Sequence, residues 1–359
     1  MALLTVTVNP HYSAPMAGPH PLLDIDGLTR WLAVQLPDGS GPITANRIGA
    51  DAGIANALFL IRRGERTMVL RRPPAQKNDP SASNTFREWR ILTALEGTPV
   101  PHPKPILHCD DASVIGAPFL LMTVVDGFTP GFVLPEPFAS SPSLRRDLAM
   151  AYVDGIVELA KVDWRARGLE GLGKPEGFLT RQVPRWLAQL NRYRTRELPE
   201  LDFVCRWLEA NTPQMSPAAI MHGDYSPFNV MVAPEPPARL AAIVDWDTGT
   251  VGDPLLDLGH LLARWTDPGE EPVLDLPAGG VEGYPTRAQM AERYAAATGR
   301  DLSALAYYEA LALFKLAVIL EGTYARQNAA GVPDEDNLMA QLVPRLLKGA
   351  AEFARGERA

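Results

Sequence analysis

Two polar clusters, each at the end of a short apolar run, constrain this chain more than any other feature. The first lies in residues 220–232, where Asp224 and Asn229 stand between β-prone apolar residues. The second begins at Asp245, directly after the apolar run 240–244. A carboxylate at the end of a buried strand costs several kcal/mol unless a cation or a hydrogen-bond donor meets it. We therefore expect both segments to bring their polar side chains to nearly the same place.

The residue types in these clusters indicate a class of chemistry. Asp224, Asn229 and Asp245 carry oxygen donors of the kind that hard cations prefer. Mg²⁺ is the simplest single partner, and Mg²⁺ beside an aspartate indicates phosphoryl transfer. A metal-dependent hydrolase that uses His222 with Asp224 and Asp245 is an alternative. The hydrolase would need no nucleotide, and its histidine would hold the divalent ion.

The length and the charge of the chain set broad limits. At 359 residues it is too long for one small core and suits two domains or lobes. It has 34 basic and 42 acidic residues, a formal net charge of −8, which disfavours general affinity for nucleic acid or anionic membranes. We therefore expect neither as a partner, and we expect a monomer or a homodimer.

Cysteine content and apolar runs indicate a compartment. Cys109 and Cys205 cannot make a disulfide framework, so they are predicted to be buried free thiols in a reducing environment. The N-terminus lacks a basic leader and a cleavage pattern, which argues against secretion. The most apolar region, residues 304–320, is interrupted by Glu309 and Lys315, so it is predicted to be a core helix. These features predict a cytoplasmic protein without a membrane segment.

The first part of the chain is predicted to be rich in strands. Apolar runs at 54–61 and 67–70 form one hairpin, and a helix follows at 85–95. Residues 114–115 and 119–125 are predicted to form a second hairpin, after which we place the boundary between two lobes. The resulting division is an N-terminal extension over 1–42, an N-lobe over 43–126 and a C-lobe over 127–359.

The second part is predicted to be mainly helical. Its helices are expected over residues 144–162, 178–196, 203–210, 286–298, 302–328 and 337–354, with a further helix that starts at Asp253. The helix predicted over 178–196 is strongly basic. It carries Arg181, Arg185, Arg192, Arg194 and Arg196.

Five short motifs occur in the order found in protein-kinase-like folds. They are Val-Leu-Arg-Arg-Pro-Pro at 69–74, Arg-Glu-Trp-Arg-Ile-Leu at 87–92, His-Gly-Asp-x4-Asn at 222–229, Ile-Val-Asp-Trp at 243–246 and Gly-Asp-Pro-x2-Asp-Leu at 252–258. With these motifs the chain resembles the aminoglycoside phosphotransferase family, the small-molecule branch of the kinase-like fold. Within that family it is similar to the kinase-like domains fused to some acyl-CoA dehydrogenases. The resemblance covers roughly residues 43–265.

The resemblance implies an α+β, bilobal, protein-kinase-like fold, with an antiparallel sheet and a helix in the N-lobe and a mainly helical C-lobe. It implies transfer of the γ-phosphoryl group of ATP, with Mg²⁺, to a hydroxyl of a small molecule; GTP is the alternative donor. Asp224 would be the base that accepts the hydroxyl proton. Asn229 and Asp245 would hold Mg²⁺. Asp247 is either a second metal ligand or a turn former.

The same resemblance assigns the nucleotide side of the site. Arg71 occupies the place where most kinase-like enzymes carry a lysine, and Glu88 is the matching helix acid, unless it lies on a solvated helix face. Arginine can grip phosphate with two hydrogen bonds, so binding is expected to survive this departure. Arg72, on the other strand face, is expected to be exposed. His222 and Asp257 would support the catalytic loop. The other residues expected around the nucleotide are Gly53, Asn56, Thr123 and Val125.

The acceptor is the least constrained part of the prediction. Aminoglycosides are polycations that need an acidic pocket, and the basic helix at 178–196 argues against one. If that helix lines the cleft, an anionic acceptor is favoured. The resemblance to acyl-CoA-dehydrogenase-linked domains indicates a hydroxyacyl-CoA. Arg71 and a phosphate loop that retains only Gly53 suggest the second hypothesis, a catalytically weak nucleotide-binding protein.

Overall fold

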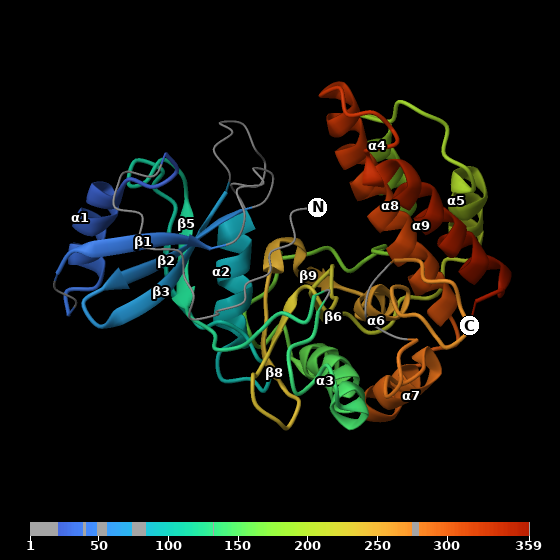
Figure 1. The fold of residues 1–359 in the computed structure, drawn as a ribbon, viewed down its shortest axis with the longest axis horizontal. Helices are drawn as coiled ribbons and strands as arrows, with labels where there is room; N and C mark the ends of the chain where they lie inside the picture. Colours follow the sequence, from blue (N-terminus) through green and yellow to red (C-terminus); the bar gives the residue numbers. More distant parts are fainter. Residues whose placement is uncertain are drawn as a thin grey trace.

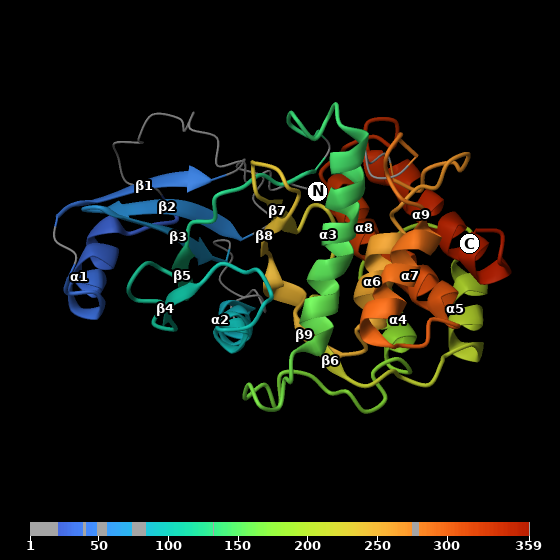
Figure 2. The same cartoon turned by 90° about the horizontal axis from the view of Figure 1, so that it is seen from below.

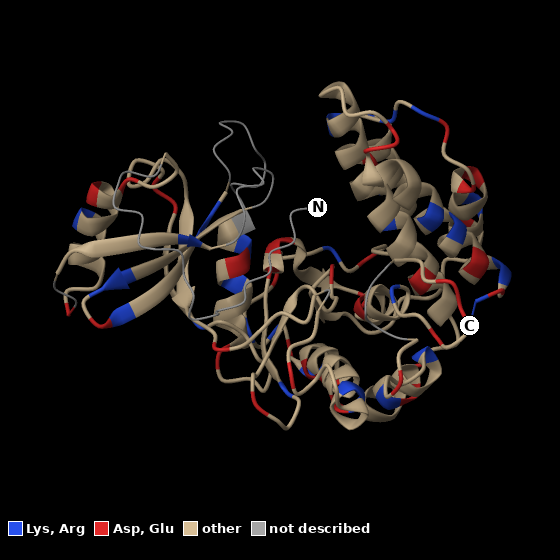
Figure 3. Cartoon of the chain, viewed as in Figure 1, with Lys and Arg blue, Asp and Glu red and all other residues tan. Residues whose placement is uncertain are grey.

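The computed structural model describes residues 21–38, 41–48, 56–73, 84–131, 133–274 and 280–358. These residues form a smaller part built on an antiparallel sheet and a larger, mainly helical part beside it (Figures 1 and 2). Helix α2 (Asn84–Leu95) lies at the junction, against β4 and β5 of the sheet on one side and the 3₁₀ helix η2 (Trp246–Thr248) on the other. The predicted α+β class is confirmed. Basic and acidic residues are interspersed along the chain in both parts (Figure 3).

Five strands form the sheet, in the order β1-β2-β3-β5-β4, and all neighbours are antiparallel. They are β1 (Ile43–Ile48), β2 (Ala57–Arg63), β3 (Arg66–Arg72), β4 (Pro105–Cys109) and β5 (Phe119–Thr123). Side chains alternate between the two faces of a strand. Phe59 and Leu70 therefore share one core with helix α1 (Ile25–Gln35), while Leu58 and Leu60 cover the opposite face with Val69.

The predicted hairpin between β2 and β3 is confirmed, but the predicted partner of β5 was wrong. Strand β5 pairs with β4, whereas Val114 and Ile115 lie in turns between the two strands. Pro105 begins β4, which is an edge strand of the sheet. An edge strand tolerates proline because its outer N–H needs no partner. The alternating prolines at 99, 101, 103 and 105 predict an extended backbone, but they do not predict that this segment pairs with a strand of the sheet.

The larger part is helical except for two short antiparallel strand pairs, β6 with β9 and β7 with β8. Besides η2, the helices and strands of this part are, in chain order, α3 (Pro142–Lys161), α4 (Gln182–Leu190), α5 (Leu201–Ala210), β6 (Ala219–Met221), β7 (Val230–Val232), β8 (Leu240–Ile243), β9 (Thr250–Gly252), α6 (Leu255–Leu262), α7 (Arg287–Thr298), α8 (Leu305–Ala329) and α9 (Leu338–Arg355).

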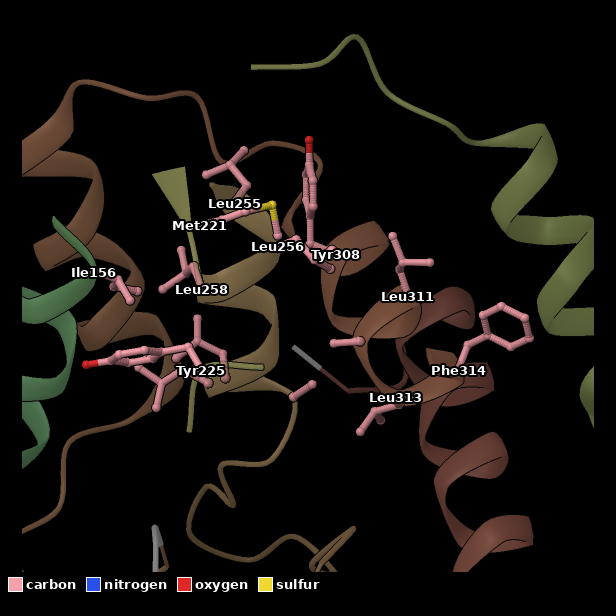
Figure 4. Packing of buried hydrophobic residues seen from close by; sticks show 14 of the residues in the cluster. Ile156, Met221, Tyr225, Leu255, Leu256, Leu258, Tyr308, Leu311, Leu313 and Phe314 are labelled. Atoms are coloured by element: carbon pink, nitrogen blue, oxygen red, sulfur yellow. The ribbon is translucent and has the colours of Figure 1, made fainter. Parts of the chain in front are cut away.

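The core of the larger part packs beneath the first polar cluster. Figure 4 shows Met221 and Tyr225 close to Leu258 of α6 and Ile156 of α3, and all four are buried. The Tyr225 hydroxyl also donates to the Tyr152 carbonyl over 2.8 Å. Each fully buried side chain of this size contributes about 1.5–3 kcal/mol. The segment that carries Asp224 is therefore anchored at both ends in the core.

The helix predicted over 178–196 is much shorter than expected. Helix α4 ends at Leu190, and the chain then leaves the helix through turns. The Tyr193 hydroxyl donates to the Val318 carbonyl of α8 over 2.5 Å, and Arg196 pairs with the buried Glu321 at 2.7 Å. These contacts with α8 hold the segment after α4 in a non-helical path, which the helical periodicity did not predict.

Other sequence predictions agree with the structure. Cys109 and Cys205 are both buried free thiols. The apolar region 304–320 lies in α8 from Leu305 onward, with Ala304 as the N-cap and with Glu309 and Lys315 buried. Within the described ranges, no helix has both the length and the apolar character needed to cross a membrane.

Candidate active site

The structure brings the two polar clusters together. Strand β7 pairs with β8, so the segment before β7 and the segment after β8 lie at the same end of this strand pair. The Val244 N–H donates to the Asn229 carbonyl over 2.9 Å, and His222 Nε2 lies 2.9 Å from the Val244 carbonyl. Asp224 and Asp245 thus belong to adjoining loops.

Arg71 on β3 links the sheet to the second cluster. Arg71 is 3% exposed and lies on the face of the sheet opposite α1. Its Nε is 2.8 Å from Glu88 Oε2, and its Nη2 is 2.6 Å from Asp245 Oδ1 and 2.7 Å from Asp247 Oδ1. One guanidinium is therefore surrounded by three carboxylates from α2 and from the segment after β8. Glu88 is buried, so the alternative that it lies on a solvated helix face is wrong.

The electrostatics of this cluster follow from burial and charge. Burial alone would lower the pKa of Arg71, but the Asp247, Glu88 and Asp245 carboxylates together raise it well above its usual range. Burial raises the pKa of Glu88 against the opposing effect of the Arg71 guanidinium. The Asp247 pKa is also raised, mainly by burial. Arg71 thus stays charged, and it is the cation that makes burial of these acids tolerable.

Local backbone geometry explains how Asp245 and Asp247 both reach Arg71. Strand β8 ends at Ile243, so Asp245 and Asp247 both lie beyond the strand. Asp245 adopts the left-handed conformation, with φ 68° and ψ 62°, which is uncommon for a residue other than glycine. Asp247 lies in η2 and also accepts a 2.5 Å hydrogen bond from Asn56 Nδ2.

The backbone before Asp224 is held by Asp257 of α6. Asp257 accepts from the N–H groups of His222 and Gly223 at 2.6 and 2.8 Å. Gly223 has φ +81°, and a Cβ there would lie 2.6 Å from the Thr248 carbonyl, so only glycine fits. The His222 ring contacts the Val244 carbonyl through Nε2 and the Asp224 N–H through Nδ1, at 3.3 Å. Both ring nitrogens are engaged inside the loop, which argues against a hydrolase whose metal is held by this histidine.

Asp224 is paired with a residue that sequence reasoning missed. Arg264, just after α6, places Nη2 2.7 Å from Asp224 Oδ1. Asn229 Nδ2 donates to the Asp224 carbonyl at 2.8 Å and lies 3.3 Å from Oδ2. Burial would raise the pKa of Asp224, but Arg264 and Lys315 lower it below its ordinary value. A basic residue directly after the apolar run of α6 was the available signal for Arg264.

Lys315 of α8 was visible in the sequence as an interruption of an apolar run, although its partners were not. Its ammonium donates to the Gly223 carbonyl and lies 3.3 Å from His260 Nε2. It also lies 5.6 Å from the centre of the Trp186 ring. Lys315 therefore holds the same backbone segment as Asp257, but as a hydrogen-bond donor to a carbonyl, whereas Asp257 accepts from N–H groups.

Burial gives Lys315 a testable effect on stability. Burial lowers its pKa from 10.5 to about 8. Below pH 8 Lys315 is charged in both the folded and the unfolded protein, so the free-energy penalty for burying its charge is complete. Between pH 8 and 10.5 only the unfolded chain keeps the proton, so this penalty becomes smaller as the pH rises. We expect the unfolding free energy of the wild type, minus that of Lys315→Met, to rise by up to about 1.4 kcal/mol per pH unit in this window. Urea denaturation at several pH values measures it, and a constant difference would contradict the assignment.

Most of the residues predicted to contact the nucleotide line one cleft beside the sheet. Its lining combines apolar residues of β1, β2 and β3 with Arg71, Glu88, Thr123, Val125, Asn229 and Asp245. Asn56 joins this group through Asp247. Gly53, predicted at the phosphate loop, lies outside the described residues.

Three of the arginines around the site have structural contacts. Arg72 is buried rather than exposed, because it donates to the carbonyls of Pro73 and Ile115 at 3.0 and 3.1 Å. Arg181 donates to carbonyls of the loop before α4, and Arg196 pairs with Glu321. Arg185 remains exposed, 5.2 Å from the centre of the Trp186 ring. Of the five arginines of the predicted basic helix, Arg185 alone lies within α4; Arg181 precedes it, and Arg192, Arg194 and Arg196 follow it.

An antiparallel β-sheet part beside a helical part, with a cleft lined by Arg71, Asn229 and Asp245, is typical of a protein-kinase-like fold. The chain belongs to the phosphotransferase enzyme family (APH), whose model matches residues 47–313. The predicted family is therefore confirmed.

Individual relatives agree with this assignment. The chain is 30% identical over 313 residues to acyl-CoA dehydrogenase family member 10 of Mus musculus; the match covers 85% of this chain and 28% of that protein. The chain thus spans less than a third of the length of that relative.

Solved structures show the same fold. A Ralstonia eutropha protein classed with the aminoglycoside phosphotransferases is 29% identical, with a TM-score of 0.76, covering 92% of this chain and 99% of the other. The streptomycin–ATP complex of APH(2'')-IIa is 16% identical, with a TM-score of 0.57 and coverage of 90% and 98%.

Proposed function

We propose that this chain is a small-molecule kinase that transfers the γ-phosphoryl group of ATP, with Mg²⁺, to a hydroxyl group. The observation that carries the proposal is that Arg71, Asn229 and Asp245 line one cleft, with Asp224 bonded to Asn229 beside it. Family membership supports phosphoryl transfer. A relative of the same fold that binds ATP supports the nucleotide.

The residues present fit a magnesium ion. Asn229 uses its amide nitrogen on Asp224, so its amide oxygen is left for another partner. The Asp245 side chain is 36% exposed, with Oδ1 turned to Arg71. No three His, Cys, Asp or Glu side chains in the described part of the chain are arranged to hold a metal by themselves. Two protein ligands suit Mg²⁺, which keeps water and phosphate oxygens as its other ligands. When bound, Mg²⁺ neutralises charge on the phosphates.

The chain's own residues then have distinct tasks. Asp224 accepts the proton of the acceptor hydroxyl, whose oxygen forms the new bond to phosphorus. The bond between that phosphorus and the bridging oxygen breaks, and ADP leaves with the electron pair. Arg71, oriented by Glu88, binds phosphate oxygens. Thr123 and Val125 contact the nucleotide, while His222 and Asp257 hold the loop.

The acceptor we propose is a hydroxyacyl-CoA. The names of relatives such as acyl-CoA dehydrogenase family member 10 support this class. Exposed Arg185 of α4 supplies a positive charge that favours an anionic acceptor over a polycation.

A second candidate function is nucleotide binding with little turnover. It is favoured by the three carboxylates that already engage Arg71, because phosphate must compete with them for the guanidinium. Thermal-shift titration with ATP and with GTP, with and without Mg²⁺, measures binding. ADP release with hydroxyacyl-CoAs, sugars, amino alcohols and aminoglycosides measures turnover. Stimulation by a sugar or amino alcohol alone would contradict the acceptor class, and binding without turnover would support the second candidate.

Asp245→Asn tests the metal assignment. Loss of one charged ligand is expected to raise the Mg²⁺ concentration for half-maximal ADP release about tenfold or more. The matched control is Asp154→Asn, which alters an exposed acid paired with Arg293 on α7. An unchanged Mg²⁺ dependence in Asp245→Asn would contradict its role as a ligand.

A further inference from the structure

Arg264 contacts the carboxylate to which the proposed function assigns proton transfer, although it belongs to none of the five motifs. Its Nη2 lies 2.7 Å from Asp224 Oδ1. The Arg264 side chain is 7% exposed, whereas that of Asp224 is 42% exposed. The ion pair therefore joins a buried cation to a carboxylate that remains accessible.

The position of Arg264 is set by the helix that also holds the loop backbone. Asp257 of α6 accepts from the N–H groups of His222 and Gly223, and Arg264 follows Asp257 by seven residues. Ala263 keeps helical angles, with φ −62° and ψ −22°. Residues seven apart lie on the same helix face, about two turns along the axis. Asp257 in α6 thus holds the backbone before Asp224, and Arg264, two residues beyond the end of α6, contacts the Asp224 side chain.

A second element restrains the loop from α8. Lys315 donates to the Gly223 carbonyl, and Asp257 accepts from the Gly223 N–H. Both backbone polar groups of Gly223 are therefore hydrogen-bonded. With the backbone held in this way, the remaining freedom of Asp224 is rotation of its side chain. The ion pair with Arg264 restricts this rotation.

We propose that Arg264 is a positioning residue, which pairs with Oδ1 of Asp224 and thereby presents Oδ2 to the acceptor hydroxyl. This inference rests on the proposed function. Rotation about χ2 of aspartate is broad, and a charge-assisted hydrogen bond narrows it. The 3.3 Å contact between Asn229 Nδ2 and Oδ2 is longer, so Oδ2 keeps capacity to accept a proton. Misplacing a reacting group by about 1 Å costs roughly 10²-fold in rate.

The test compares three variants in the full chain. Arg264→Met removes the ion pair, Arg264→Lys keeps the charge, and Arg293→Met removes an exposed Arg–Asp pair of similar length between α7 and α3. ADP release with Mg²⁺-ATP is measured with the acceptor found in the screen and with water alone. We expect kcat of Arg264→Met to fall about 10–100-fold with the KM for ATP unchanged, partial recovery in Arg264→Lys, and no change in Arg293→Met.

The readouts separate positioning from simple structural support. An unchanged kcat in Arg264→Met overturns the proposal. So does a fall in kcat accompanied by an equal loss of ATP-induced thermal stabilisation, without recovery in Arg264→Lys. If Arg264→Met does not fold, Arg264→Gln replaces it with the same readouts.

Failure of the proposed function is distinguishable from failure of this inference. If the wild type releases no ADP with any acceptor or with water, the kinase assignment fails. A crystal structure of Arg264→Met then decides the positioning role. An Asp224 carboxylate that changes orientation or takes several orientations supports it, and one that keeps its wild-type orientation overturns it.

Discussion

Replacing Asp224 with asparagine is expected to lower the rate of phosphoryl transfer about 10²–10⁴-fold while nucleotide affinity is retained. The amide cannot accept the hydroxyl proton, but its oxygen can still accept from Arg264, which now lies 2.7 Å from Oδ1. The cleft residues Arg71 and Asp245 are untouched by the change. ADP release measures the rate, and calorimetric titration with Mg²⁺-ADP measures affinity.

Asp154→Asn is the matched control, because Asp154 also accepts from an arginine, at 2.6 Å, but on the exposed surface of α3. It should behave as the wild type in both measurements. Wild-type turnover in Asp224→Asn would exclude this carboxylate as the base. Loss of Mg²⁺-ADP affinity together with turnover would instead place Asp224 in nucleotide binding.

Replacing Arg71 with methionine is expected to destabilise the protein by about 3–5 kcal/mol and to abolish nucleotide binding. The reason is that Glu88 is buried and would lose the guanidinium at 2.8 Å, while Asp245 and Asp247 would repel each other unscreened. Urea denaturation measures the stability, and thermal shift with Mg²⁺-ATP measures the binding.

The pH dependence of that loss has a definite sign. Burial already raises the pKa of Glu88 above its ordinary value of 4.5, and removal of Arg71 takes away the main opposing charge. The penalty for burying Glu88 is absent below pH 4.5, where the acid is protonated in both the folded and the unfolded protein, and it grows with pH until the folded-state pKa is passed. That pKa is about 8 in the wild type and is expected to be higher in Arg71→Met, so the two proteins differ in this penalty above about pH 8. The stability difference between wild type and Arg71→Met should therefore shrink toward acidic pH.

Two further variants test the explanation for Arg71. Arg71→Met combined with Glu88→Leu should be more stable than Arg71→Met alone, because no unpaired buried charge remains at Glu88. Arg66→Met, at the exposed start of the same strand, alters a weak pair with Asp38 at 3.9 Å and should change stability little. A double variant no more stable than Arg71→Met would contradict the idea that Glu88 causes the loss.

Much of the fold was predictable because its signals are local. The apolar runs of β2 and β3 and the helical pattern of α2 each arise within about a dozen residues, and all three elements are present. The pairing of β4 with β5 was not predictable, since the prolines before β4 mark an extended path without naming its partner. The end of α4 was missed for a similar reason, because contacts of Tyr193 and Arg196 with α8 override the helical pattern.

The sequence by itself determined that Asp224, Asn229 and Asp245 would converge, because each lies within a few residues of a short apolar strand and a carboxylate there requires a partner. The resemblance to the phosphotransferase family, rather than the residues alone, identified Arg71 and Glu88 as a pair, which the structure joins at 2.8 Å. Only the tertiary structure decided that Arg264 and Lys315 complete the site: Arg264 is 40 positions from Asp224, and Lys315 is 92 from Gly223. Spacing carries no information at such separations, because the packing of α6 and α8 against the loop selects which charged side chain meets it.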